Sequence, residues 1–273
     1  MRTSLAVLSL SLLWGCFTLS AAAATVEVVP GGSTVAGKPI GEWTADWWNW
    51  ANSVSPNVFN DTTGAQATVN QSGPVFFVAG TSSGSPPVTR NFTVPQGKYV
   101  LFPLINWLVA NGPDPGFANT ADEATALVDG TVDVAQLVAQ IDGIDVSDLA
   151  SHREQSPINF TLNVAADTTG AFPPGTYTDA NSDGYWIMLA PLPAGESHSL
   201  HFGGTSKDFT GPAPAEGNPL TVPSFTIDVT SNITVAGAAA IPLPPAVLSC
   251  IPFGATALVA AQWRRLRRRA CRA

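Results

Sequence analysis

The chain has 273 residues and a formal net charge of −8, and 12% of its residues are charged. Between residues 25 and 240 five Lys and Arg stand against all twenty Asp and Glu, so five minus twenty gives about −15 for this segment. Nucleic-acid binding requires clustered cations, so this composition excludes nucleic acid as a partner.

The first 24 residues have the pattern of a secretory signal peptide. Arg2 is the only early cation, and it precedes an apolar core and a run of alanines at 21–24. Signal peptidase cuts after small residues, so we expect recognition of Ala22 and Ala24 and cleavage after Ala24. Cys16, in Leu-Trp-Gly-Cys, leaves open the alternative of a lipid-modified cysteine. Either signal sends the chain to the export machinery.

A tryptophan-rich segment at 41–51 predicts the first helix. It contains four of the eight tryptophans of the chain. In a helix, Trp43, Trp47 and Trp50 fall on one stripe, which we expect to pack against a β-sheet because each indole buries a large apolar area.

Trp48 lies off this stripe, and two interpretations are open for the segment. In the first, the tryptophans serve only the core. In the second, Trp48 is a platform for ligand binding, with Glu42 or Asp46 beside it. The C–H faces of sugars stack on indole rings, so the second interpretation makes these three residues a candidate sugar site.

Apolar segments separated by Gly, Pro, Ser and Asn clusters predict a mainly β domain over 25–236. Apolar and polar residues alternate at 160–164 and 225–235, as in strands with one buried face, whereas 74–79 and 99–105 are continuous apolar runs typical of strands covered on both faces. We therefore expect an antiparallel β-sandwich or jelly-roll with one or two short helices. Because residues 17–249 contain no cysteine, this domain depends on an ordinary hydrophobic core.

The second helix is predicted from the sequence Thr-Ala-Asp-Glu at 120–123. This is the pattern of a capping box, in which the first and fourth side chains bond backbone amides of the first turn. The helix is expected to start at Thr120 and to include the apolar residues at 124–128.

Asp179, Asn181 and Asp183 match the first half of a calcium-binding loop, with a glycine at its sixth position. The twelfth position is Ala190, where such a loop has a bidentate Glu. We therefore expect a hairpin turn rich in Asp and Asn, with calcium as the alternative.

His198 and His201 lie in a segment that we expect to be a strand. Residues three apart on a strand face opposite sides, which argues against a zinc pair. Glu196 and His198 share a face. A two-residue metal or acid/base site is therefore an alternative to a histidine that only forms surface or cross-strand hydrogen bonds.

The C-terminal segment, 237–273, combines a proline-rich break, an apolar run at 246–261 and a basic end. The break contains Pro242, Leu243, Pro244 and Pro245, and the basic end contains Arg264, Arg265, Arg267, Arg268 and Arg269. This order predicts a hydrophobic helix that enters the membrane from outside and stops where its arginines meet the cytoplasm. Sixteen residues span only about 24 Å as a helix, which favours a transient, processed anchor over a permanent single span.

This segment resembles the PEP-CTERM class of bacterial sorting signals in a Pro-Leu-Pro variant, without the Glu that the class has between its prolines. The resemblance implies recognition by an exosortase-type membrane protease. Over about 40–235 the chain also resembles a group of uncharacterised exported bacterial proteins, through Gly-Glu-Trp-x-Ala-x-Trp-Trp-x-Trp-Ala at 41–51, Gln-Ser-Gly-Pro-Val-Phe-Phe at 71–77 and Asp-Gly-Tyr-Trp at 183–186. That resemblance implies a shared fold and export, and it carries over no catalytic residue.

Together these patterns predict an exported structural or adhesive protein of the cell envelope or of an exopolysaccharide matrix. Its expected partners are signal peptidase, an exosortase-type protease, the membrane and exopolysaccharide. The sequence contains no serine-hydrolase elbow, phosphate loop or zinc-protease motif, so no enzyme activity and no cofactor other than the alternative calcium are expected. The alternative function is a carbohydrate-binding module or glycan-active enzyme that uses the tryptophan-rich helix.

Overall fold

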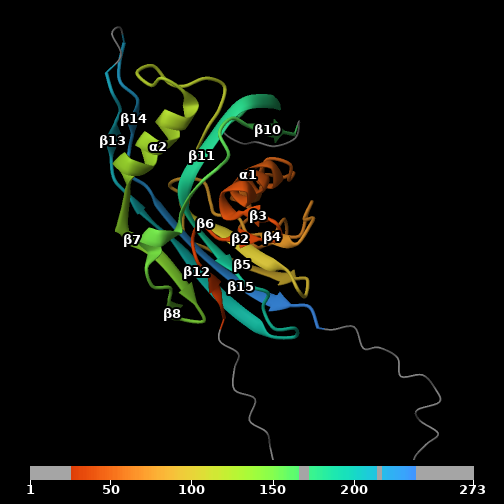
Figure 1. Ribbon diagram of the computed structural model, residues 1–273. Coiled ribbons are helices and arrows are strands. Elements are labelled where there is room, and N and C mark those ends of the chain that lie inside the picture. Colours follow the sequence, from red (N-terminus) through yellow and green to blue (C-terminus); the bar gives the residue numbers. More distant parts are fainter. Residues whose placement is uncertain (1–25, 166–171, 214–216, 238–273) are drawn as a thin grey trace, which may run out of the picture.

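The computed structural model describes residues 26–165, 172–213 and 217–237 (Figure 1). The predicted signal peptide with Cys16, Ala22 and Ala24 and the predicted sorting segment with its hydrophobic helix lie outside the described residues. The strands are β1 (Val28–Val29), β2 (Thr34–Val35), β3 (Lys38–Pro39), β4 (Val75–Phe77), β5 (Val88–Val94), β6 (Tyr99–Val109), β7 (Val132–Ile141), β8 (Ile144–Asp145), β9 (Arg153–Gln155), β10 (Phe160–Val164), β11 (Gly175–Leu189), β12 (Ser197–Ser206), β13 (Phe209–Thr210), β14 (Thr221–Val222) and β15 (Thr226–Val235). The helices are α1 (Ile40–Ala51) and α2 (Thr120–Thr131), with 3₁₀ turns η1 (Val58–Asn60) and η2 (Leu149–His152).

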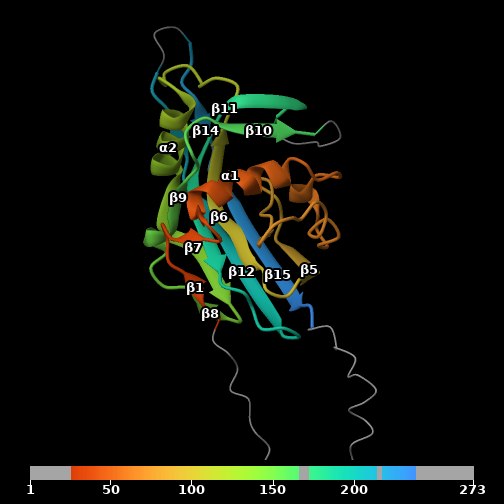
Figure 2. The ribbon, with the colours of Figure 1, turned by 45° about the vertical axis from the view of Figure 1, so that its right-hand side comes forward.

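The described fold is mainly β, as predicted, with two large sheets. The first sheet has the order β1-β11-β6-β4, and β9 and β10 also pair with β11. The second has the order β5-β15-β12-β7-β8. Figures 1 and 2 show α1 lying against the first sheet and α2 beside the upper part of β11. Neither helix of the described chain has the length and hydropathy that a membrane span needs.

The largest hydrophobic cluster lies between the two large sheets. It joins residues of β6 and β11 to residues of β12 and β15, and the rings of Phe102 and Phe202 meet across it with centroids 4.7 Å apart. A second cluster covers the other face of the first sheet, where Leu101 and Met188 pack against α1. Strands β4 and β6 are therefore buried on both faces, which confirms the interpretation of their continuous apolar runs.

The sheets are not purely antiparallel, and this part of the prediction was wrong. Strand β4 pairs with β6 in parallel, and β5 pairs with β15 in parallel. The reason lies in the connections, since parallel neighbours require a crossover. Strand β5 provides one of them, because the chain leaves the first sheet after β4, forms β5 in the second sheet and returns as β6. The alternation of apolar residues does not encode strand direction.

Helix α1 confirms the predicted stripe. Trp43, Trp47 and Trp50 are buried against the first sheet, and Val54 continues the stripe beyond the helix. Each indole N–H donates to a backbone carbonyl at 2.9 Å, from Trp43 to Val35, from Trp47 to Val78 and from Trp50 to Val69. A buried indole N–H needs such an acceptor, so these bonds fix both the depth and the rotation of the helix.

Helix α2 forms where predicted, but its N-cap is one residue earlier than expected. The Asn119 side chain accepts a hydrogen bond from the Asp122 N–H at 2.8 Å. The Glu123 carboxylate accepts from the Asp114 N–H at 2.5 Å. Asn is as good an N-cap as Thr and stands directly before Thr120, so the helix begins at Thr120 as expected and Asn119 caps it.

A nearly buried ion pair joins β9 to β11. Arg153 contacts both carboxylate oxygens of Asp183, at 3.0 and 2.7 Å, and also reaches Asp129 at 2.6 Å. The Asp183 side chain is only 1% exposed. Its charge therefore depends on Arg153 for compensation, and these hydrogen bonds raise the pKa of Arg153 above its ordinary value.

Replacing Arg153 by Met should destabilise the protein by about 3–5 kcal/mol, because it leaves the Asp183 carboxylate buried without its cation. Urea denaturation of the full chain measures this loss. Lys38→Met is the matched control, since it breaks a pair whose two side chains are 41% and 40% exposed and should cost at most about 1 kcal/mol. Equal losses in the two variants would contradict the assignment.

Glu154, the next residue on β9, is buried without a cation at ion-pair distance among the described residues. Its carboxylate accepts from the Gly32 N–H at 2.6 Å. Burial raises the pKa of Glu154, and this hydrogen bond opposes the rise only in part. Because the pKa of Glu154 is higher in the folded than in the unfolded protein, its contribution to the free energy of unfolding is complete at low pH. This contribution is lost as the pH rises through the folded pKa.

Glu154→Gln should therefore be more stable than the parent at neutral pH, because the amide oxygen keeps the Gly32 bond and carries no charge. The difference should shrink as the pH falls below the raised pKa. Thermal unfolding over a pH series measures it, with the exposed Glu42→Gln as control. A constant difference at every pH would rule out ionisation of Glu154 as the cause.

Candidate functional site

The Trp48 cavity, a hollow of about 440 Å³, lies beside the C-terminal half of α1. Its size falls within the range of about 300–1,000 Å³ that is usual for small-molecule sites. Five aromatic rings and eight further uncharged side chains form its wall, from segments far apart in the chain. They are Trp48, Asn52, Asn57, Phe59, Thr81, Ser82, Ser83, Asn106, Trp107, Leu108, Phe172, Phe225 and Ile227.

The orientation of Trp48 follows from the burial of its neighbours. Because the other three tryptophans of α1 face the first sheet, Trp48 projects to the side, where it remains half-buried. Its indole N–H donates to the Ser182 hydroxyl on β11 at 2.8 Å. The rings of Trp47 and Phe59 lie 5.0 and 6.1 Å from it, centroid to centroid. These contacts hold the indole in one orientation before any ligand is present.

Trp107 forms another part of the wall and is held in the same way. It lies on β6, and its indole N–H donates to the Thr131 hydroxyl at the end of α2 at 2.9 Å. The ring of Phe225 packs edge-on against it at 5.7 Å. Both indole N–H groups of the cavity are thus bonded within the protein, so the rings offer their apolar surfaces to a ligand.

Two buried polar atoms of the cavity wall have no hydrogen-bond partner in the described structure. They are the Thr81 hydroxyl oxygen and the Asn106 amide nitrogen. Buried polar groups are nearly always bonded, so each of these two atoms needs a partner from outside the chain, which a water molecule or a ligand hydroxyl can provide. Gly184 on β11 permits the close position of Asn106, because a Cβ at Gly184 would lie 2.5 Å from the Asn106 Cα.

The structure does not bring Glu42 and Asp46 to Trp48. Asp46 forms an exposed ion pair with Lys38 at 2.7 Å, and Lys38 also lies over the Trp43 ring. Glu42 is exposed in the first turn of α1. At about 100° per residue, Asp46 lies about 200° around the helix from Trp48, on the opposite side. Neither carboxylate lines the cavity.

Asp179, Asn181 and Asp183 lie in the continuous strand β11, so the predicted hairpin turn was wrong. Asp179 accepts from the backbone N–H groups of Asn111 and Gly112, and these bonds lower its pKa although burial opposes them. The Asn181 amide donates to side chains of two other segments, and Asp183 pairs with its arginine as described above. Most bonding partners of these three residues are distant in sequence, whereas a local turn would have used neighbouring backbone groups.

Calcium binding at β11 stays a prediction, although the extended backbone of this strand differs from the loop on which the prediction was based. Across the described ranges no group of three or more His, Cys, Asp or Glu is arranged to hold a metal ion.

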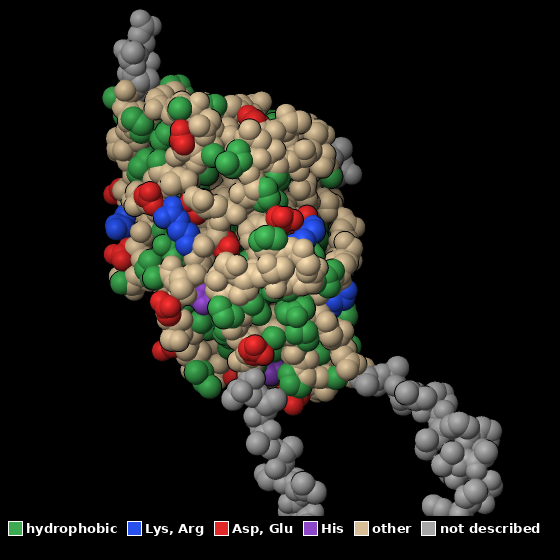
Figure 3. All heavy atoms as spheres, in the orientation of Figure 1, with side chains coloured by type: hydrophobic (Ala, Val, Ile, Leu, Met, Phe, Trp, Pro, Cys, Tyr) green, Lys and Arg blue, Asp and Glu red, His purple; other side chains and the backbone are tan. Residues whose placement is uncertain are grey.

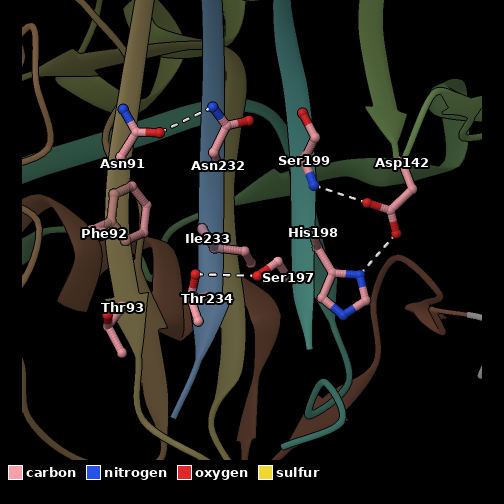
Figure 4. Close-up of a pocket in the computed structure, with 10 residues that line it drawn as sticks. All are labelled: Asn91, Phe92, Thr93, Asp142, Ser197, His198, Ser199, Asn232, Ile233 and Thr234. Atoms are coloured by element: carbon pink, nitrogen blue, oxygen red, sulfur yellow. Dashed lines mark hydrogen bonds and ion pairs between the residues drawn. The ribbon is translucent and has the colours of Figure 1, made fainter. Parts of the chain in front are cut away.

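A second hollow, of about 620 Å³, lies open on the β5-β15-β12 surface (Figure 4). His198 is buried there. Its Nδ1 lies 2.8 Å from Asp142, and its Nε2 lies 3.7 Å from Glu196, which confirms that His198 and Glu196 share a side of the strand. His201 is more exposed and lies 3.1 Å from Asp228, so the two histidines do not converge on one site.

Other polar side chains of this hollow bond one another. Asn232 donates to Asn91 at 3.1 Å, and the hydroxyls of Ser197 and Thr234 lie 3.3 Å apart (Figure 4).

Among its described residues, the second hollow has one buried polar atom without a hydrogen bond, His198 Nε2, and one Phe, Phe92. The Trp48 cavity differs, because it combines five fixed aromatic rings with two such atoms. We therefore take the Trp48 cavity as the candidate functional site. Comparisons of the chain with protein-family models, with curated proteins and with solved structures find no match.

Proposed function

We propose that the chain is an exported protein of the cell envelope or extracellular matrix that binds a saccharide in the Trp48 cavity. The cavity itself carries this proposal. Sugars present apolar C–H faces and a rim of hydroxyls, and the cavity presents aromatic surfaces beside the unbonded Thr81 and Asn106 atoms. Because Trp48 and Trp107 are already held by hydrogen bonds, little ordering of the protein opposes binding.

We propose binding and adhesion as the role of the cavity, in place of cleavage. Most glycoside hydrolases use two carboxyl groups that flank the scissile bond. The thirteen wall residues that the structure describes are all uncharged, and the two carboxylates that the sequence suggested do not line the cavity. The cavity is therefore equipped to hold a sugar by contact and hydrogen bonding.

The proposal for location rests on the two terminal segments. The signal-peptide pattern at 1–24 supports export, and the order Pro-Leu-Pro-Pro, apolar run and arginines supports sorting by an exosortase-type protease. The described domain between them has two large sheets with a shared core, which supports its assignment as a β-sandwich. Exopolysaccharide is the saccharide that a matrix would supply.

Thr81→Val tests the binding site without removing a bond of the fold. The Thr81 hydroxyl has no partner within the described structure, so the variant should unfold at the same temperature as the parent or at a higher one. Its affinity for a bound saccharide should fall roughly tenfold, equivalent to about 1.4 kcal/mol. A glycan array with the full-length chain identifies the saccharide, and calorimetry measures the change.

Thr89→Val on the exposed face of β5 is the matched control and should leave the affinity unchanged. If the array shows no saccharide bound by the parent chain, or if both variants bind as the parent does, the proposed function fails.

Deletion of 241–273 tests the proposed sorting. The truncated chain should be released into the medium or retained on the export pathway, because it lacks the segment that engages the membrane and the protease. Fractionation of cells that express the full and truncated chains, with detection by antibody, measures the difference. Identical distribution in the envelope fractions would show that the segment has no part in location.

A further inference from the structure

We infer that the saccharide bound in the Trp48 cavity is an uncharged one, and not a uronate or a sulfated or phosphorylated sugar. The inference rests on the proposed function and narrows it to one chemical class. The first observation is the cavity wall, where the polar members among the described residues have hydroxyl and amide side chains only. The unbonded Asn106 amide is a donor, and the Thr81 hydroxyl both donates and accepts, so together they match the hydroxyl groups of a neutral sugar.

The second observation concerns the cations. All five Lys and Arg between residues 25 and 240 lie in the described ranges, and each already has a partner. Lys38 pairs with Asp46, Arg153 with Asp183 and Asp129, Lys207 with Asp133, Lys98 with the Gly73 carbonyl, and Arg90 with the carbonyls of Asp61, Ala79 and Gly80. In Figure 3 the Lys and Arg side chains are few, and most lie beside acidic ones. None of these five side chains lines the Trp48 cavity, so an anionic ligand bound there would meet no cation among the described residues of the wall.

Arg90, on β5, bonds the carbonyls of Ala79 and Gly80 directly before Thr81, but it cannot turn to a ligand in the cavity without breaking bonds of the fold. Arg90 is 2% exposed, and its guanidinium bonds the carbonyls of two separate segments, at Asp61 and at Gly80. Burial lowers the pKa of Arg90 to about 10, so it remains charged at neutral pH. Withdrawing this side chain would leave several buried carbonyls without donors.

The surrounding charge acts in the same direction. A segment with five cations and twenty acids produces a negative potential that repels anions at long range. Inside the cavity, an anion would lose its hydration without gaining a cation, and burial of an unpaired charge is strongly unfavourable. A neutral sugar meets neither cost, because its hydroxyls exchange bonds with water for bonds with Asn106 and Thr81.

The test compares neutral oligosaccharides with uronate oligomers of the same linkage, by calorimetry on the full-length chain. We expect binding of a neutral member and at least a tenfold weaker affinity for its uronate counterpart, with neutral binding unchanged between about 0.05 and 0.5 M NaCl, a range over which ion pairs are screened. Uronate binding that equals or exceeds neutral binding would overturn this inference and leave the proposed function intact. Absence of binding by either class would overturn both.

A variant that gains affinity for the uronate oligomer provides a second test. Ser82 is an exposed member of the cavity wall, so Ser82→Lys adds a cation without disturbing the core. The variant should bind the uronate oligomer about tenfold more tightly than the parent does, through a charge-assisted contact. Ser82→Gln, of similar length and without charge, should not. Equal uronate affinity in the parent and in both variants would show that missing positive charge is not what excludes acidic sugars.

Discussion

The buried face of α1 is the constraint on which the candidate site depends. Trp43, Trp47 and Trp50 fill the space over the first sheet, and each donates its indole N–H to a carbonyl of a different segment. Large rings with one obligatory donor leave the helix no freedom to roll, because a rotation would both open gaps and break three hydrogen bonds. The direction of Trp48 is thus a consequence of packing on the other side of the same helix.

The cavity combines aromatic surfaces with polar atoms that have no partner in the described structure. Five buried side-chain atoms in the described structure have no hydrogen-bond partner, and two of them lie in the wall of this one cavity. The aromatic rings around them have their own N–H groups satisfied by Ser182 and Thr131. The indole N–H groups are thus bonded within the protein, whereas the Thr81 and Asn106 atoms are not. This contrast favours a ligand that is apolar on its faces and hydroxylated at its edge.

Much of the scaffold could be predicted from local patterns, and most of the site could not. Indole spacing gave the correct buried side of α1, and apolar alternation located β10 and β15, because both depend on residues close in sequence. Helical geometry alone would also have separated Trp48 from Asp46. The meeting of Trp48 with Trp107 and Phe225 depends on strand pairing over long distances, which single-sequence periodicity does not contain. The turn predicted at Asp179 failed for the same reason.

The parallel pair β5-β15 determines how late in its synthesis the chain can complete its fold. Residues 88–94 find their neighbour only at 229–235, the last described strand, so nearly the whole domain must be present before the second sheet closes. Contacts so distant in sequence slow folding, since the intervening chain must first be brought into a loop. During synthesis, which proceeds from the N-terminus, the edge of β5 has no partner until residues 229–235 have been made. An unpaired strand edge can pair with another chain, so this domain is most exposed to aggregation late in its synthesis.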